Sequence, residues 1–125
     1  HNAVREFALL HLYDEEAAFS VFTANYVPKD EALLMERLLA HEVDFESNTT
    51  WHGDQMAVLH MNKAPKAALS YIFNTTYCSC CRFHALEEMG RRRMLTSAML
   101  EECQFDANDD IRAYARRALK RRAKK

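Results

Sequence analysis

Residues 108–122 read NDDIRAYARRALKRR, which is the clearest helical pattern in the chain. Asn108 can cap the first turn of a helix, and Asp109 and Asp110 suit the positive end of the helix dipole. Apolar residues recur at the helical period of about 3.6, at Ile111, Tyr114, Ala115, Ala118 and Leu119. The stretch therefore predicts an amphipathic helix with one apolar face and one strongly basic face.

The same helical period recurs along the rest of the chain, whereas no stretch keeps the alternation of a strand. The expected apolar stripes are Val4, Phe7, Ala8 and His11; Ala18, Phe19, Phe22 and Tyr26; Leu34, Met35, Leu38 and Leu39; Met56, Leu59 and His60; Ala68, Leu69, Ile72 and Phe73; and Met94, Leu95, Ala98 and Met99. A further helix is expected from Cys78 to Met89. The pattern predicts about eight helices, mostly of roughly 10 to 14 residues.

Residues that start or stop helices set the expected boundaries. Asp30 is expected to cap the third helix, and residues 45–50 are expected to form a polar loop before the fourth. Gly90 is expected to close a helix as its C-terminal residue, with a new helix over residues 91–103. Residues 104–108 are then expected to link that helix to the last one.

The composition favours an all-α chain. Only two glycines and two prolines occur among 125 residues, and no Asn-Gly or Asp-Gly pair is present. β-sandwiches and barrels need such residues at their hairpins, so the composition argues against them. No apolar run is long enough to cross a bilayer. We expect one helical domain over residues 1–125, and because residue 1 is His rather than an initiator Met, a fragment or a processed chain stays open.

Three segments of the second half carry a family resemblance. Residues 67–74 look like the helix end of a repeat unit, residues 81–90 like the short helix that finishes in Gly, and residues 109–119 like the helix that lines the inner face. On these segments, residues 67–122 resemble an armadillo or HEAT-type helical repeat. The resemblance implies antiparallel helical hairpins stacked as an α-solenoid fragment, and a compact helical bundle is the alternative.

The two halves of the chain carry opposite charge. Residues 1–60 contain eleven acidic and three basic residues, a net charge of −8. Residues 61–125 contain seven acidic and fourteen basic residues, a net charge of +7. Charge segregation of this kind bears on partners and association rather than on fold. It therefore points to complementary surfaces on neighbouring molecules.

The basic residues near the C-terminus form the expected binding surface. Arg112, Arg116 and Lys120 lie at i, i+4 and i+8, so they form one ridge of the last helix. The other expected members are Arg117, Arg121 and Lys124 beside the ridge, and Arg91, Arg92 and Arg93 in a second cluster that joins it if the helices pack side by side. Such a surface attracts an acidic protein, nucleic-acid phosphates or an anionic membrane.

Cysteines and histidines are the remaining candidates for chemistry. Metal-ligand types gather at Cys78, Cys80, Cys81, His84 and Cys103. Because only Cys103 could act as a distant ligand arm, we expect thiols that pack as small apolar groups, with a zinc site as the alternative. The histidines at positions 41, 52 and 60 form no H-E-x-x-H motif, and no phosphate loop or nucleophile elbow occurs. We expect no catalytic residue, no metal and no cofactor.

The crowded cysteines also bear on location, because three within four positions cannot staple distant segments. This favours an intracellular protein, either cytoplasmic or in a mitochondrial or other organellar matrix. We expect a non-enzymatic scaffold that binds protein partners within a larger complex, through an acidic N-terminal half and a basic C-terminal helix. An RNA-associated subunit of an organellar ribonucleoprotein is the first alternative, and a small metal-stabilised domain is the second. No small-molecule substrate is evident.

Overall fold

A computed structural model describes residues 2–12, 17–40 and 48–124, and in these ranges the chain is helical without any strand. The elements are α1 (Asn2–Leu10), α2 (Ala18–Ala24), the short 3-10 helix η1 (Pro28–Asp30), α3 (Glu31–Leu39), α4 (Asn48–Leu59), α5 (Lys66–Thr75), α6 (Ser79–Arg91), α7 (Ser97–Cys103) and α8 (Asp109–Ala123). The prediction of an all-α fold is therefore confirmed. None of the described helices is both long and apolar enough to span a membrane.

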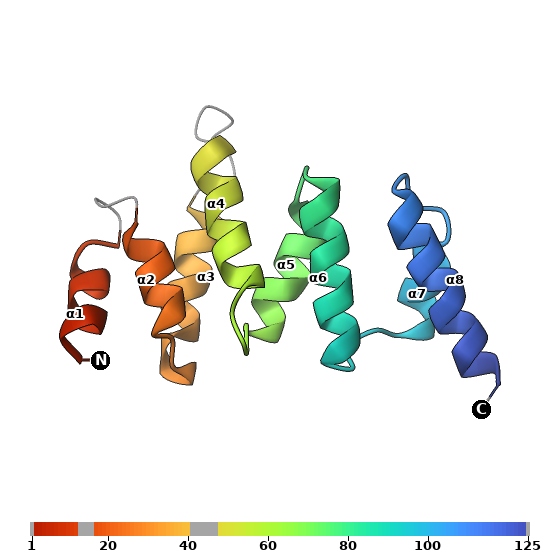
Figure 1. The fold of residues 1–125 in the computed structure, drawn as a ribbon, viewed down its shortest axis with the longest axis horizontal. Coiled ribbons are helices and arrows are strands. Elements are labelled where there is room, and N and C mark those ends of the chain that lie inside the picture. Colours follow the sequence, from red (N-terminus) through yellow and green to blue (C-terminus); the bar gives the residue numbers. More distant parts are fainter. Residues whose placement is uncertain (1, 13–16, 41–47, 125) are drawn as a thin grey trace.

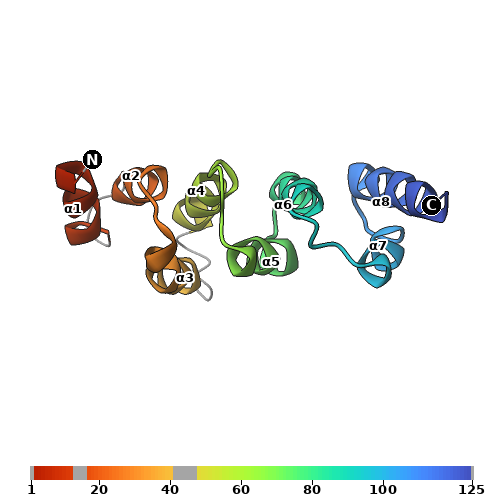
Figure 2. The ribbon, with the colours of Figure 1, turned by 90° about the horizontal axis from the view of Figure 1, so that it is seen from below.

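The helices form two parallel rows that make an elongated molecule, with the two chain ends at opposite extremes (Figure 1). Seen from below, α1, α2, α4, α6 and α8 lie in one row and α3, α5 and α7 in the other (Figure 2). From α2 onward, the chain crosses to the other row with each helix. Within the first row α2, α4, α6 and α8 are successive neighbours, while α5 packs on α6 and α7 packs on α8.

The hydrophobic core runs along the seam between the two rows. The largest fully buried apolar side chains of the helices come from six of them, namely Phe19, Phe22, Leu34, Leu38, Leu69, Ile72, Leu86, Met89, Leu100 and Ile111. Burying one such side chain stabilises a fold by roughly 1.5–3 kcal/mol. Since most of these residues stand at the predicted helical spacings, the apolar pattern identified most of the core.

Two buried ion pairs tie neighbouring elements of the first half together. The Arg37 guanidinium in α3 donates from Nε to the Asp54 carboxylate in α4 at 3.1 Å, and both side chains are almost completely buried. Arg5 of α1 donates from both terminal nitrogens to Asp30, at 2.5 Å each. This pairing holds the pKa of the Asp30 carboxyl below its usual range. The paired residues are 17 and 25 positions apart in the sequence, so both contacts are tertiary.

The predicted role of Asp30 as the cap of α3 is wrong. Its side chain accepts no hydrogen bond from the first turn of α3, although the residue stands at the N-cap position. It accepts instead from the Arg5 guanidinium and from the backbone N–H of Val27 at 3.1 Å. The physical reason is that two parallel hydrogen bonds from a positively charged guanidinium outweigh the bond of the same carboxylate to one neutral backbone N–H.

The predictions around Gly90 are also wrong. The α6 helix continues through Gly90 to Arg91, and the following residues form a loop rather than the start of a helix over residues 91–103. The Arg93 N–H donates to the Gly90 carbonyl at 3.1 Å, and the Met94 N–H donates to the Met89 carbonyl at 2.9 Å. This pair of bonds is a Schellman motif, in which Arg93 takes the left-handed position with a φ of 57°.

The first and fourth helices differ from the predictions in smaller ways. In α1, Val4 and Phe7 are about half exposed, while Ala8 is buried. The reason is that α1 ends the row and, among the described helices, packs on α2 alone, so it buries only a narrow face. The fourth helix begins at Asn48, so the last three residues of the predicted loop are helical. The rest of that loop, residues 45–47, lies outside the described residues.

Candidate functional site

The last helix is anchored by its cap and by its apolar face. The Asn108 side-chain oxygen accepts from the backbone N–H groups of Asp110 at 2.8 Å and Ile111 at 3.0 Å, which confirms the predicted cap. Ile111, Ala115 and Ala118 are buried, so this side of α8 faces the core. Because one face is fixed in this way, the opposite face of α8 must point outward.

Four exposed cations of α8 and the lysine that follows its last residue form a group that we call the α8 basic face. They are Arg116, Arg117, Lys120, Arg121 and Lys124. All five are exposed, and in the described parts of the chain none of their side chains makes a hydrogen bond or an ion pair. Their charges are therefore available to another molecule. The last lysine of the chain lies outside the described residues.

Arg112, the first member of the predicted ridge, is engaged in contacts within the protein. Its guanidinium donates to the carbonyl oxygens of Asp106 at 2.7 Å and Ala107 at 3.1 Å. It also forms an ion pair with Asp109 in the first turn of α8. These contacts close the turn before the helix, so the structure separates Arg112 from the cations of the α8 basic face.

The second predicted cluster, Arg91 to Arg93, also contains both arginines whose side chains bond to the protein itself and, as far as the described residues go, one whose side chain does not. Arg92 donates to the Ala64 carbonyl at 2.5 Å, so it ties the end of α6 to the loop before α5. Arg91 is exposed and pairs with Glu88 one turn earlier in its own helix, which raises the pKa of its guanidinium. Arg93 is exposed, and among the described residues its side chain has no hydrogen-bond or ion-pair partner.

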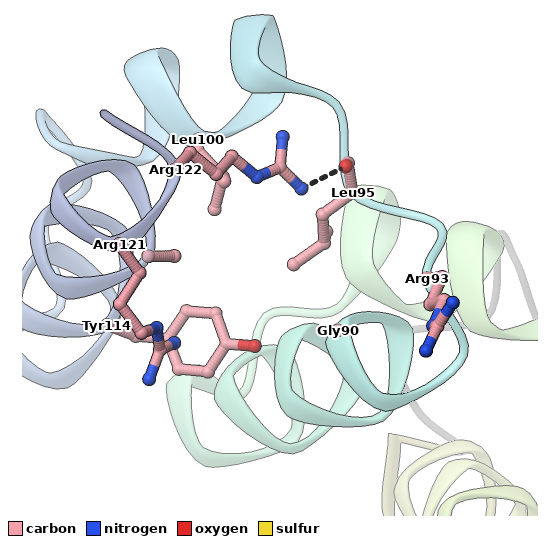
Figure 3. A pocket seen from close by; sticks show the side chains of 8 residues that line it. Gly90, Arg93, Leu95, Leu100, Tyr114, Arg121 and Arg122 are labelled. Carbon is pink, nitrogen blue, oxygen red and sulfur yellow. Dashed lines mark hydrogen bonds between the residues drawn. The ribbon is translucent and has the colours of Figure 1, made fainter. Parts of the chain in front are cut away.

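A cavity of about 520 Å³ lies between the C-terminal ends of α6 and α8. Figure 3 shows the side chains that surround it, which come from α6, α7, α8 and the loop after α6. The lining residues are Gly90, Arg93, Leu95, Leu100, Tyr114, Ala118, Arg121 and Arg122. The structure thus brings Arg93 of the second predicted cluster to the same cavity as Arg121 of the first.

Arg122 holds one wall of this cavity in place. Its guanidinium donates to the Leu95 carbonyl at 2.6 Å, as Figure 3 shows, and to the Ser97 hydroxyl at 3.0 Å. Both acceptors lie at the start of α7, so the contact fastens α8 to the loop that precedes α7. No pattern in the sequence predicts this cavity, because the distance between α6 and α8 depends on how the helices pack.

The cysteines are placed as packing groups rather than as a joint site. Cys81 and Cys103 are buried, whereas Cys80 is exposed. Burial, with a smaller contribution from the neighbouring Cys78, raises the pKa of the Cys81 thiol to about 12. Burial also raises the pKa of Cys103. Both thiols are therefore protonated near neutral pH, which makes them poor nucleophiles.

Side chains of the types that bind metals do not come together in the described part of the chain. No group of three or more His, Cys, Asp or Glu side chains there could hold an ion. His60 and His84 are exposed on different parts of the chain. The side chains of His41 and His52, for which the sequence predicts no site, lie outside the described residues.

The comparisons with known proteins add no relative. No protein-family model matches the chain, and neither the curated proteins nor the solved structures contain a match to it.

Proposed function

We propose that this chain is a non-enzymatic scaffold that binds an acidic protein partner through the α8 basic face. One observation carries the proposal. Five neighbouring cations are exposed on a helix whose other side is fixed in the core, and among the described residues nothing neutralises them. Charged surfaces of this kind guide and orient association, while apolar contacts supply most of the affinity.

The elongated shape supports the proposal, because it keeps the two charged halves of the chain apart. The described acidic residues of the first half lie in η1 and the helices α1, α3 and α4, whereas α8 with its basic residues lies at the opposite end of the molecule from α1 (Figure 1). None of the described acidic side chains of α1 to α4 pairs with the cations of α8. The acidic half is then available to a basic neighbour in a larger complex.

We also infer the finer architecture from the two rows. Helices that cross between rows at each step form antiparallel hairpins, and stacked hairpins are the arrangement of armadillo and HEAT-type solenoids. The resemblance of residues 67–122 to such repeats agrees with this inference. A solenoid serves well as a scaffold because it offers long surfaces to several partners.

An acidic protein suits the α8 basic face better than a nucleic acid does. Proteins that bind single strands stack bases on exposed aromatic rings set among the cations. The aromatic residue of α8 is Tyr114, and its ring turns toward Gly90 of α6 rather than outward (Figure 3). Phosphate contacts without base stacking remain the competing outcome of the test.

The test compares two double variants, each of which replaces two basic residues by glutamate, so both change the net charge of the chain by the same amount. Arg116→Glu with Lys120→Glu alters the α8 basic face, and Lys63→Glu with Lys66→Glu alters exposed lysines elsewhere. Binding of a labelled polyglutamate peptide and of a labelled single-stranded RNA homopolymer is measured over a range of salt concentrations. We expect the first variant to weaken peptide binding by about tenfold or more, and the control to have much less effect.

Salt dependence and ligand choice decide the outcome. Peptide binding by the wild-type chain should weaken as salt rises. Equal loss in both variants would mean that net charge alone matters, which would overturn the role of the α8 basic face. Tighter binding of RNA than of the peptide would replace the proposal with the nucleic-acid alternative.

A further inference from the structure

We propose that the cavity between the C-terminal ends of α6 and α8 is the anchor site for an acidic partner segment that carries a large apolar side chain. The inference rests on the proposed function and specifies the chemistry of the partner. The apolar side chain enters the cavity, and flanking Asp or Glu carboxylates meet the arginines at its rim.

The size and lining of the cavity suit such a side chain. Its volume of about 520 Å³ falls within the range of roughly 300–1,000 Å³ that is usual for ligand pockets. The Tyr114 ring supplies an aromatic surface, Leu95 and Ala118 each expose a small apolar area, and Leu100 is fully buried in the wall (Figure 3). An inserted Leu or Phe side chain would therefore leave water for an apolar surrounding, which is favourable in proportion to the area buried.

The charges around the cavity all have one sign. Three of the eight lining residues are arginines, and none of the eight is acidic. Arg122 is engaged with the chain itself, whereas the side chains of Arg93 and Arg121 make no hydrogen bond or ion pair with any described residue. A free guanidinium favours carboxylates, because it can donate two parallel hydrogen bonds to one carboxylate.

The walls of the cavity are held in place before any partner arrives. Arg122 fastens the Leu95 carbonyl to α8 at 2.6 Å, and the two bonds of the Schellman motif fix the loop that carries Arg93. Tyr114 rests against Gly90 on the α6 side. A site that needs little ordering on binding loses less of its interaction energy to entropy.

The shape of the second row explains why the cavity exists. The backbone of α7 approaches that of α8 but not that of α5, as far as the described residues go. The helix pair α7–α8 therefore joins the rest of the molecule mainly through α6, and side chains from α5 do not fill this end of the seam. A partner side chain would complete the packing there.

The chemistry argues for an acidic peptide and against a phosphodiester. A nucleic-acid backbone could meet the arginines, yet it has no aliphatic group to place against Leu95, Leu100 and Ala118. An acidic peptide with an apolar centre satisfies both halves of the site. The apolar preference therefore distinguishes this site from the rest of the α8 basic face.

The experiment uses two labelled acidic nonapeptides of Asp and Glu that differ only at the centre, Leu-Phe in one and Ser-Gly in the other. Wild-type protein should bind the Leu-Phe peptide about tenfold more tightly or better. Ala118→Met narrows the cavity and should abolish that preference while the Ser-Gly peptide binds as before. Arg121→Ala should weaken the Leu-Phe peptide more than the matched change Arg117→Ala, since Arg117 does not line the cavity.

A second measurement on the wild-type chain does not depend on the stability of any variant. In an amide NMR titration, the Leu-Phe peptide should shift the resonances of Gly90, Leu95 and Leu100. Shifts confined to other regions would overturn the site. If an RNA oligonucleotide caused the same shifts, the occupant of the cavity would be a nucleic acid instead. If raising the protein concentration without peptide caused them, the occupant would be a second copy of this chain.

The outcomes also separate this inference from the proposed function. If both peptides bind with equal affinity and in a salt-dependent way, the α8 basic face is supported and the anchor site is overturned. If neither peptide binds at low salt, the proposed function fails and the anchor site fails with it.

Discussion

The hydroxyl of Tyr114 in α8 lies directly against the backbone of Gly90 in α6, so close that a Cβ atom at position 90 would overlap it. The Tyr114 ring also makes an edge-to-face contact with Phe83, with ring centroids 6.4 Å apart. This approach explains a glycine within α6, where its helix propensity is poor. It sets the spacing of α6 and α8, and so it sets one side of the cavity between them.

We predict that Gly90→Ala destabilises the protein although alanine is the better helix former. The added methyl group must displace the Tyr114 side chain, and overpacking of this kind costs about 1–3 kcal/mol. Adding Tyr114→Phe to the Gly90→Ala variant should recover much of the loss, because the overlapping hydroxyl is then absent. Urea unfolding of the two single variants and the double variant measures this coupling.

The second glycine of the chain provides the matched control. Gly53 lies in α4, and no heavy atom lies within 4 Å of the place that a Cβ atom would take there. Gly53→Ala should therefore raise the free energy of unfolding by about 0.5–1 kcal/mol. A stabilising effect of similar size at position 90 would contradict the close approach of Tyr114.

Arg93 holds a left-handed backbone conformation with a φ of 57° at the position where a Schellman motif usually has glycine. We predict that Arg93→Gly stabilises the protein by up to about 1 kcal/mol, because glycine adopts this conformation without steric cost. The same change removes a cation from the cavity rim, so it should weaken the Leu-Phe peptide. Thermal unfolding and the peptide titration together check the trade between stability and binding.

Asparagine at position 93 separates the two effects, since it tolerates the left-handed region better than most residues and carries no charge. Arg93→Asn should weaken peptide binding with little change in stability. A stability loss with Arg93→Gly would show that the arginine side chain contributes to the fold.

We predict that Asp54→Ala lowers the free energy of unfolding by about 3–5 kcal/mol, because it removes the carboxylate of an ion pair that is almost completely buried between α3 and α4. Arg37 also lies over the Phe19 ring at 5.6 Å, so its displacement disturbs the contact with α2. Arg91→Ala removes an exposed pair with Glu88 and should cost less than about 1 kcal/mol. Equal effects of the two changes in chemical denaturation would contradict the burial of the Arg37–Asp54 pair.

We predict that the four thiols differ in reactivity according to burial. At about pH 8, iodoacetamide should modify the exposed Cys80 of the folded protein, while Cys81 and Cys103 should resist until urea is added. Peptide mapping by mass spectrometry assigns the modified residues. Rapid alkylation of Cys81 in the folded protein would contradict its raised pKa.

The same raised pKa predicts how stability depends on pH. The Cys81 thiol ionises at about 8.5 in the unfolded chain but at about 12 in the folded protein. Its contribution is therefore complete below about pH 8.5, and it is lost as the pH rises toward 12, because the unfolded chain releases the proton first. Cys81→Ala should flatten this alkaline decline in urea unfolding measured at increasing pH.

Features that depend on residues within one or two helical turns can be predicted from the sequence alone. The Asn108 cap and the buried stripe of Ile111, Ala115 and Ala118 follow from local spacing, and the structure confirms them. The scarcity of glycine and of hairpin dipeptides was enough to predict an all-α chain. Such signals are reliable because a helix satisfies its own backbone hydrogen bonds, so its partners lie close in the chain.

Which polar and basic side chains make contacts within the fold depends on how distant helices pack, so the sequence does not predict it. Asp30 looks like a cap in the sequence, yet it pairs with Arg5 from 25 residues away. Arg112 and Arg122 look equivalent to Arg121 along the chain, but backbone carbonyls occupy the first two and leave the third exposed at a cavity. A long side chain chooses among all acceptors within its reach, and the packing of distant helices determines which acceptors those are.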